Sequence, residues 1–289
     1  MSRRVGLASF QAKELLRKSN LKAKKGLGQH FLIDENALKV VISTAELSAE
    51  DIIVEVGPGL GILTNELARQ TSKVIAIELD TKLASLLEHR VASFFNVTVV
   101  NADVLKVNLS DLLEGRDGYK VVANLPYYIT SPVLQYFVEA KLKPSLMVVM
   151  LQKEVGETIV ASPGEMTWLS NKLQFYSKPR IISYVLSQSF YPQPKVDSVI
   201  VRFDMLPEPA VEVANTAEFF DMVRLGFSAP RKQLRNSLAQ GLHVAPSEAT
   251  PLLERAGIEP QRRAETLALL EWKRLYDVLK VLGKGNVPC

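Results

Sequence analysis

Cysteine is almost absent from this sequence, and histidine is scarce. The only cysteine among the 289 residues is Cys289, the last one, so no disulfide can form within the chain. The three histidines, His30, His89 and His243, lie far apart and lack the spacing of metal ligands. These absences exclude a disulfide scaffold, predict no metal site and suit a reducing compartment. We therefore expect a cytoplasmic protein.

Long apolar runs are missing as well. The longest strongly apolar stretch, LMVVML at 146–151, is far shorter than the roughly 20 residues that cross a bilayer, so we expect no membrane association. Residues 1–26 lack the apolar segment of a secretory signal. Their arginines leave an organellar presequence as an alternative. A basic amphipathic helix is the favoured interpretation, because the segment continues directly into GLGQHFL.

The remaining composition is that of an ordinary globular protein, with 47% hydrophobic and 23% charged residues. The 35 basic and 31 acidic residues give a net charge of +4, which permits a polyanionic partner without requiring one. A chain of 289 residues is long enough for one large domain and a smaller one, each with its own core. We expect it to act as a monomer.

Short apolar runs alternate with helical patterns in the first half of the chain. Five runs predict strands, at residues 51–57, 73–80, 97–103, 120–126 and 145–152. Residues 63–70 and 81–94 have the period of helices. Because the runs are β-branched and apolar on both faces, they favour a parallel sheet covered by helices. The pattern predicts a doubly wound α/β domain that binds ligands at the carboxyl ends of its strands.

The second half of the chain changes character after two further predicted strands, at 179–187 and 196–205. From Thr216 onward every segment has a helical period. We place the boundary near Pro207 and Pro209. The predicted organisation is a basic extension over 1–25, an α/β domain over 26–208 and a smaller all-helical domain over 209–289.

The first strand ends in VEVGPGLGILT, a glycine-rich turn built on Gly57, Gly59 and Gly61. Such a turn lets backbone N–H groups approach a ligand closely. A dinucleotide fingerprint would need glycine at Ile62 and would hold a pyrophosphate, which the carboxylate of Glu55 would repel. Glu55 would instead pair with an ammonium group. These features favour S-adenosylmethionine, which carries an amine and a cationic sulfonium.

Two more strand ends carry acidic residues. Glu78 lies about 20 residues after the first glycine, which is the spacing of a carboxylate that binds a ribose. Asp103 ends the third strand and can accept a hydrogen bond from an adenine amino group. Helix capping is the alternative role for both, but Asp80 is the better cap for the helix that starts at Thr81. Together the strand ends predict a nucleoside-binding crevice.

The fourth strand ends in ANLPYY, and its Asn–Leu–Pro–Tyr tetrad resembles the signature of methyltransferases that act on exocyclic amino groups of nucleobases. Acceptors on Asn124 and Leu125 would bind the amine hydrogens, and Pro126 would stiffen the backbone. Tyr127 would stack on the target base. We assign Tyr128 to packing. Taken alone, a plain turn would explain this stretch, but its register with the other strand ends favours catalysis.

The whole sequence resembles the adenine N6,N6-dimethyltransferases that modify small-subunit ribosomal RNA. The resemblance is carried by KKGLGQHFLID, VEVGPGLGILT, ANLPYYITSPVL, MLQKEV, FYPQPKVDSVIVR, APRKQLRNSL and AGIEPQRRAETL, which together span nearly the whole chain. It implies a Rossmann-like, S-adenosylmethionine-dependent methyltransferase domain followed by a helical domain that recognises RNA or the ribosomal subunit. Its implied product is dimethyladenosine at two adjacent adenosines in the terminal hairpin of that RNA, within a precursor of the small subunit.

The resemblance also implies roles for individual residues. Cofactor contacts are implied for His30, Leu32, Gly57, Glu78, Asp103 and Asn124. Phe190 matches an aromatic residue that would cover the target adenine opposite Tyr127. Other members carry asparagine at the position of His30, and the residues alone favour a packed loop histidine there.

Two alternatives stay open at this point. One is the large-subunit adenine methyltransferase of antibiotic resistance, which the PQPKVDS block and the carboxyl-terminal blocks disfavour. The other is a ribosome-assembly factor that binds RNA without catalysis. Basic residues that could contact RNA are Arg17, Lys18, Lys22, Lys24, Lys25, Arg231, Lys232, Arg235, Arg262 and Arg263. Each cluster by itself is more typical of a solvated helix face.

Overall fold

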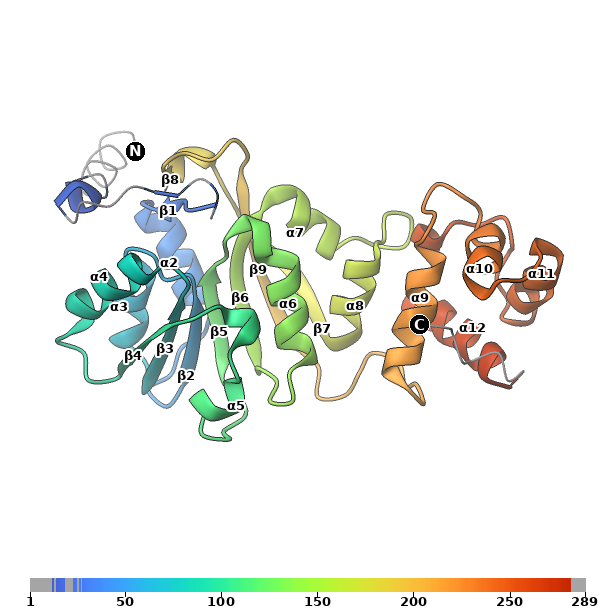
Figure 1. Ribbon diagram of the computed structural model, residues 1–289, viewed down its shortest axis with the longest axis horizontal. Coiled ribbons are helices and arrows are strands. Elements are labelled where there is room, and N and C mark those ends of the chain that lie inside the picture. Colours follow the sequence, from blue (N-terminus) through green and yellow to red (C-terminus); the bar gives the residue numbers. More distant parts are fainter. Residues whose placement is uncertain (1–11, 13, 19–22, 25, 27, 282–289) are drawn as a thin grey trace. The chain divides into compact units, whose positions relative to one another are not determined.

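A seven-stranded sheet forms the centre of the amino-terminal part of the protein (Figure 1). The computed structural model describes residues 12, 14–18, 23, 24, 26 and 28–281. In spatial order the strands are β4 (Val97–Asn101), β3 (Lys73–Glu78), β2 (Ile52–Val56), β5 (Lys120–Asn124), β6 (Leu146–Gln152), β9 (Ser198–Met205) and β7 (Ser177–Val185). All seven strands predicted from the sequence are present.

The pairing of these strands sets the position of the site. Neighbours from β4 to β6 are parallel, whereas β9 runs antiparallel to β6. The carboxyl ends of β2, β3, β4, β5 and β6 therefore lie along one edge of the sheet, which we call the catalytic edge; it is the upper edge in Figure 1. This arrangement confirms the predicted Rossmann-like α/β fold.

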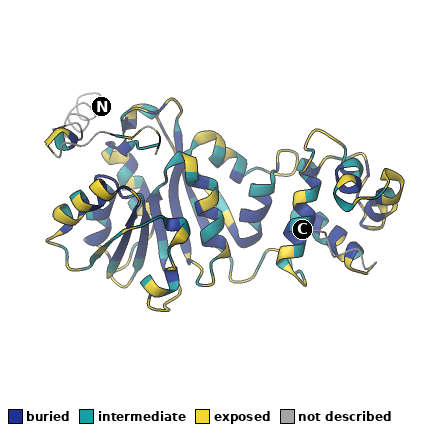
Figure 2. Ribbon diagram, viewed as in Figure 1, coloured by how far each residue is buried: buried dark blue, intermediate teal, exposed yellow. Residues whose placement is uncertain are grey.

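Helices cover both faces of the sheet and complete the core (Figure 1). They are α2 (Glu35–Thr44), α3 (Ile62–Ala68), α4 (Thr81–Val91), α5 (Leu109–Leu112), α6 (Thr130–Glu139) and α7 (Lys153–Ile159). The valines that predicted buried strands are buried: Val54, Val121 and Val148 have no exposed surface. Figure 2 shows the central strands buried and the outer helix faces exposed.

A short ribbon beyond the catalytic edge was not predicted. β1 (Phe31–Leu32) and β8 (Phe190–Tyr191) pair in antiparallel fashion, with Phe31 opposite Tyr191 and Leu32 opposite Phe190. Strands of two residues are too short to leave a periodic pattern in a sequence. The ribbon fixes the segment before α2 over the mouth of the sheet.

The chain from Thr216 onward is helical, as predicted, with α9 (Thr216–Gly226), α10 (Leu234–Leu242), α11 (Pro246–Arg255) and α12 (Leu269–Val281). The helix α8 (Trp168–Tyr176) lies within the predicted α/β domain but packs with these helices. Their core is aromatic, with Phe175 stacked on Phe219 at a centroid distance of 5.5 Å and Trp272 fully buried. These helices belong to a compact unit whose described residues are 157–178 and 206–281. The predicted limits of the three domains stay predictions.

Two further observations concern the described residues alone. None of the helices within them is both long and apolar enough to cross a membrane. The same residues contain no group of three or more His, Cys, Asp or Glu side chains that could hold a metal ion. Much of the predicted basic extension over 1–25, including Lys22 and Lys25, lies outside the described residues.

Candidate active site

The glycine-rich turn after β2 forms the floor of a pocket at the catalytic edge. Gly57 and Gly59 adopt positive φ angles of 66° and 55°, which residues with side chains rarely tolerate. A Cβ atom on Gly59 would lie 2.9 Å from the Phe31 ring, and one on Gly57 would lie 3.3 Å from the Pro126 ring. Glycine is therefore required because three segments of the chain meet here.

Glu78 closes this turn from the neighbouring strand. Its Oε2 accepts a hydrogen bond from the backbone N–H of Gly59 at 3.2 Å, and its Oε1 accepts one from the N–H of Asp80 at 2.9 Å. Burial raises the pKa of the Glu78 carboxyl above its usual value. Asp80 caps α4 through Lys82 and Leu83, as predicted, and this leaves Glu78 facing the pocket.

Glu55 lies deeper in the same pocket. Its side chain is 1% exposed, and Oε2 has no hydrogen-bond partner in the described part of the chain. Burial, together with repulsion from Glu78, raises the pKa of Glu55 to about 8. The carboxyl group is therefore largely protonated at neutral pH. A cation placed beside it would lower the pKa of the carboxyl, so that the proton is released to solvent and the unpaired oxygen gains a partner.

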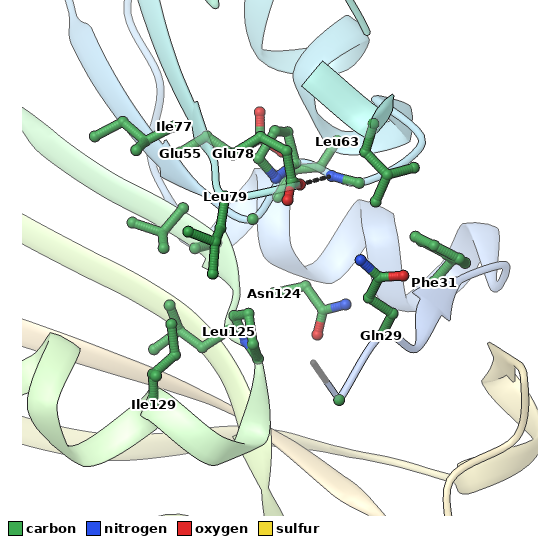
Figure 3. A pocket seen from close by; sticks show the side chains of 18 of the residues that line it. Gln29, Phe31, Glu55, Leu63, Ile77, Glu78, Leu79, Asn124, Leu125 and Ile129 are labelled. Carbon is green, nitrogen blue, oxygen red and sulfur yellow. Dashed lines mark hydrogen bonds between the residues drawn. The ribbon is translucent and has the colours of Figure 1, made fainter. Parts of the chain in front are cut away.

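Asn124, at the end of β5, points into the pocket (Figure 3). Its Nδ2 donates a hydrogen bond to the backbone oxygen of His30 at 3.1 Å. Leu125 is held by its own backbone N–H, which donates to the oxygen of Met150 at 2.9 Å. Pro126 follows with φ −59° and packs on Gly57. The turn after β5 is therefore anchored on both sides.

Tyr127 begins the short 3-10 helix η3 (Tyr127–Ile129) and is held by two contacts. Its hydroxyl shares a hydrogen bond with the Ser198 hydroxyl, 2.7 Å away. The His30 ring stacks on its ring at a centroid distance of 5.6 Å. Nδ1 of His30 lies 2.6 Å from the Pro192 oxygen, and because a carbonyl only accepts, Nδ1 carries the proton. His30 thus orients Tyr127.

One pocket brings together nearly all the predicted site residues. It is lined by His30, Leu32, Gly57, Glu78, Asp103, Asn124, Leu125, Pro126 and Tyr127. Asp103 also caps the 3-10 helix η2 (Val104–Lys106) through the N–H of Leu105, so the capping alternative and a place in the pocket coexist. Phe190 does not line the pocket; it is 2% exposed and packs in the core. Its predicted stacking role stays a prediction.

The packing role assigned to Tyr128 was wrong. Tyr128 is 48% exposed and lines the pocket, where a Cβ on Gly28 would touch its ring at 3.5 Å. Consecutive residues of a 3-10 helix point in different directions, so Tyr127 is held by Ser198 while Tyr128 stays exposed. An aromatic residue directly after a catalytic turn was the signal for this position.

A second missed feature is a strap made of residues 28–32, which line the pocket. Lys24 Nζ lies 2.7 Å from Asp80 Oδ2, and Gln29 Nε2 donates to the same oxygen at 3.3 Å. The backbone N–H of Lys24 donates to Gln29 Oε1 at 2.8 Å. Asp80 therefore caps α4 and also holds the strap across the pocket. No local pattern in the sequence indicates this pairing.

Comparison with known proteins identifies the family. Residues 20–280 match the family model described as "Ribosomal RNA adenine dimethylase". The chain belongs to this family. Relatives named "Ribosomal RNA small subunit methyltransferase A" include one from Dehalococcoides mccartyi (strain 195), 47% identical over 92% of this chain and 91% of its own length. Another, from Clostridium botulinum (strain Okra), is 42% identical over 93% of this chain and 98% of its own.

Solved structures agree with this result. The 23S rRNA methyltransferase ErmE is 28% identical, with a TM-score of 0.68 over 86% of this chain and 99% of that one. A dimethyladenosine transferase from Plasmodium falciparum gives a TM-score of 0.74 at 24% identity, over 88% of this chain and 98% of that one, and supports the fold. This member of the ribosomal RNA adenine dimethylase family is thus an S-adenosylmethionine-dependent enzyme that acts on ribosomal RNA adenine.

The pocket of this ribosomal RNA adenine dimethylase suits that cofactor. The buried, unpaired oxygen of Glu55 is complementary to a cationic amine. The Glu78 carboxylate, placed at the next strand end, can accept hydrogen bonds from ribose hydroxyls. Leu79 is 45% exposed and lines the pocket, so it offers an apolar surface to a purine.

Proposed function

We propose that this protein transfers methyl groups from S-adenosylmethionine to N6 of two adjacent adenosines in the 3′-terminal hairpin of small-subunit ribosomal RNA, giving N6,N6-dimethyladenosine. The observation that carries the proposal is the Asn124 amide, whose nitrogen is held by His30 so that its oxygen is left for a substrate amine. Relatives 47% and 42% identical over most of their length are named as small-subunit methyltransferases.

The chain's own residues would hold the cofactor at the carboxyl ends of β2, β3 and β4. Glu55 would receive its amine, Glu78 its ribose and Asp103 its adenine amino group, while the turn at Gly57 provides close backbone approach. When bound, the cofactor supplies an electrophilic methyl group. The strap at residues 28–32 would cover the pocket and exclude water from it.

The target amine needs activation because its lone pair is delocalised into the adenine ring. The Asn124 side-chain oxygen and the Leu125 backbone oxygen would accept the two N6 hydrogens and favour a pyramidal nitrogen. Its lone pair would then point at the reacting carbon. After transfer the nitrogen is acidic enough to lose its extra proton to water, so no general base is required. Catalysis is positioning of the amine by fixed acceptors.

The target base would lie on Tyr127 after it leaves the RNA stack. Ser198 and His30 hold the tyrosine ring before substrate arrives, so little entropy is lost when the base binds. Phe190 is our proposed contact for the second face of the base. Because Phe190 belongs to β8 and is only 2% exposed, this role requires the β1–β8 ribbon to shift when RNA binds.

The proposed substrate in the cell is a precursor of the small ribosomal subunit, which the protein would meet in the cytoplasm as a monomer. The decisive experiment is methyl transfer from labelled S-adenosylmethionine to small subunits that lack the modification, followed by nucleoside analysis. We expect N6,N6-dimethyladenosine at two adjacent positions. Small subunits without dimethyladenosine would refute the proposal. Activity restricted to protein-free large-subunit RNA would instead identify an enzyme of the antibiotic-resistance type.

A further inference from the structure

Exposed apolar side chains gather beside the catalytic edge. Of the nine large hydrophobic side chains that are exposed in the described part of the chain, four lie between residues 182 and 196. They are Ile182 (37% exposed), Tyr184 (55%), Leu186 (55%) and Val196 (37%). Alternate residues of β7 are exposed, so Ile182 and Tyr184 share one face of this edge strand. Such a grouping on a protein surface marks a contact site.

Tyr184 lies at the catalytic edge. The Lys153 ammonium is positioned over the Tyr184 ring, 5.7 Å from its centroid. Lys153 directly follows β6, whose carboxyl end belongs to that edge. The aromatic face and an exposed cation therefore lie together beyond the carboxyl end of β6, the strand whose Met150 pairs with Asn124.

Hydrogen bonds connect this surface to the ring that would stack on the target base. The backbone N–H of Lys153 donates to the Asp197 oxygen at 3.0 Å, and the Asp197 carboxylate accepts from the Ser187 N–H at 2.8 Å. The next residue, Ser198, bonds to the Tyr127 hydroxyl at 2.7 Å. Tyr127 and the surface around Tyr184 are thus fixed to two adjacent residues, Ser198 at the start of β9 and Asp197 just before it.

The side chains of this surface are better suited to contact a nucleobase than to bind several RNA phosphates. Lys153 and Lys195 provide two exposed cations, but the adjacent Glu154 is exposed as well. Charge alone would therefore attract RNA only weakly, and the aromatic ring with its apolar neighbours offers more. An enzyme that takes a base out of its stack also exposes the face of the neighbouring base. A tyrosine beside the pocket can cover that face.

We propose that Tyr184, Leu186, Val196 and Lys153 form a platform for the nucleotide next to the target adenosine, with its base on the Tyr184 ring and its phosphate near Lys153. The proposal rests on the function proposed above. With this platform, the RNA chain would run from the target adenosine on the Tyr127 ring toward β7. In RNA with two adjacent target adenosines, the platform would hold a flanking base while one adenosine reacts.

The test compares Tyr184→Ala with two other variants. Tyr184→Phe keeps the ring, and Phe95→Ala removes a fully exposed aromatic side chain near β4, at the opposite edge of the sheet. With small subunits lacking the modification, we expect Tyr184→Ala to raise the KM for the subunit on the order of tenfold, from the loss of one base–aromatic stack. Tyr184→Phe and Phe95→Ala stay within about twofold of wild type, and the Kd for S-adenosylmethionine is unchanged in all three.

Ultraviolet crosslinking of wild-type protein to the subunit provides the second measurement. We expect the peptide that contains Tyr184 to crosslink to a nucleotide beside the modified adenosines. An unchanged KM in Tyr184→Ala, or a crosslink from this peptide to a ribosomal protein or to a second copy of the chain, would overturn the platform while dimethyladenosine formation still supports the function. If wild type forms no dimethyladenosine, the proposed function is wrong. The crosslink, and co-sedimentation of Tyr184→Ala with the subunit, would then still show whether the platform binds RNA.

Discussion

The Nδ2 atom of Asn124 lies 3.1 Å from the backbone oxygen of His30, and this single contact decides which end of the amide faces the substrate. A carbonyl oxygen can only accept, so the amide nitrogen must be the atom that faces it. The amide oxygen is left for the hydrogens of the target amine. His30 belongs to the strap and not to the sheet, so covering the pocket and orienting the catalytic amide are coupled.

Replacing Asn124 tests this coupling. Asn124→Ala removes the acceptor, and we expect methyl transfer to fall by at least about 100-fold, in line with the loss of one positioned group that stabilises a transition state. Asn124→Asp should not rescue activity, because a carboxylate oxygen would then face the His30 oxygen. Single-turnover methylation checks the rate, and co-sedimentation with small subunits should show nearly unchanged binding. Wild-type turnover in Asn124→Ala would contradict the assigned role.

Glu55 should make stability depend on pH in the cofactor-free protein. Its pKa is about 8 in the folded state against an ordinary value of 4.5, so between these values the native state binds more protons than the unfolded state. The free energy of unfolding therefore falls as pH rises through that window. Glu55→Gln cannot ionise, so we expect it to exceed wild type in stability by up to a few kcal/mol at pH 9 and to match it near pH 4.

Urea unfolding at both pH values measures this effect, with Glu50→Gln, an exposed glutamate of the same unit, as the matched control. Glu55→Gln should bind the cofactor more weakly than wild type, because it has no carboxylate for the cationic amine. Isothermal titration in buffers of different ionisation enthalpy should show proton release on cofactor binding by wild type and less by Glu55→Gln. Equal pH dependence in the two proteins would rule out an ionisable, buried Glu55.

The sheet was predictable because each strand carries its own signal. Val121 and Val122 are β-branched, apolar on both faces and fully buried, and only a central strand covered on both sides requires that. The order of strand ends then placed Glu78, Asp103 and Asn124 at one edge, where the structure has them. Because the carboxyl ends of parallel strands lie at the same edge of the sheet, a residue at the end of a predicted strand has a predictable position. Most of the pocket could therefore be predicted from the fold.

The contacts that orient the catalytic groups were not predictable. His30 meets Asn124 across 94 positions and Pro192 across 162, and such pairings leave no local period in a sequence. The β1–β8 ribbon that brings them together has two residues in each strand. Tyr128 was misassigned for a related reason, because the direction of a side chain in a 3-10 helix depends on where its neighbour Tyr127 is held.

Asp80 has two roles that one substitution can separate. Asn is as good a helix cap as Asp, so Asp80→Asn should keep the cap on α4 and lose the charge that pairs with Lys24. We expect nearly unchanged thermal stability and a several-fold rise in the Kd for S-adenosylmethionine, because the strap is released. Asp80→Ala should show both defects, with about 1 kcal/mol lost from the missing cap.

Asn215→Ala provides the control for capping, because Asn215 caps α9 in the helical unit. It should lower the melting temperature like Asp80→Ala and leave cofactor affinity at the wild-type value. Calorimetry and fluorescence titration of the same preparations make the comparison. A normal Kd in Asp80→Asn would show that the ion pair with Lys24 does not hold the strap.

The basic residues of the helical unit should separate into two kinds. Arg262 forms a double hydrogen bond with the Glu271 carboxylate, at 2.6 and 3.1 Å, and its side chain also bonds Thr266, so it supports the fold. Arg231 and Lys232 are exposed. Arg262→Gln should therefore lower the melting temperature and leave the salt dependence of RNA binding unchanged.

Arg231→Gln and Lys232→Gln should each reduce the slope of log K against log salt by about 1 at unchanged stability, if each neutralises one phosphate. Filter binding across a salt series decides between the two kinds, and an unchanged slope in both exposed variants would exclude this segment from the RNA contact.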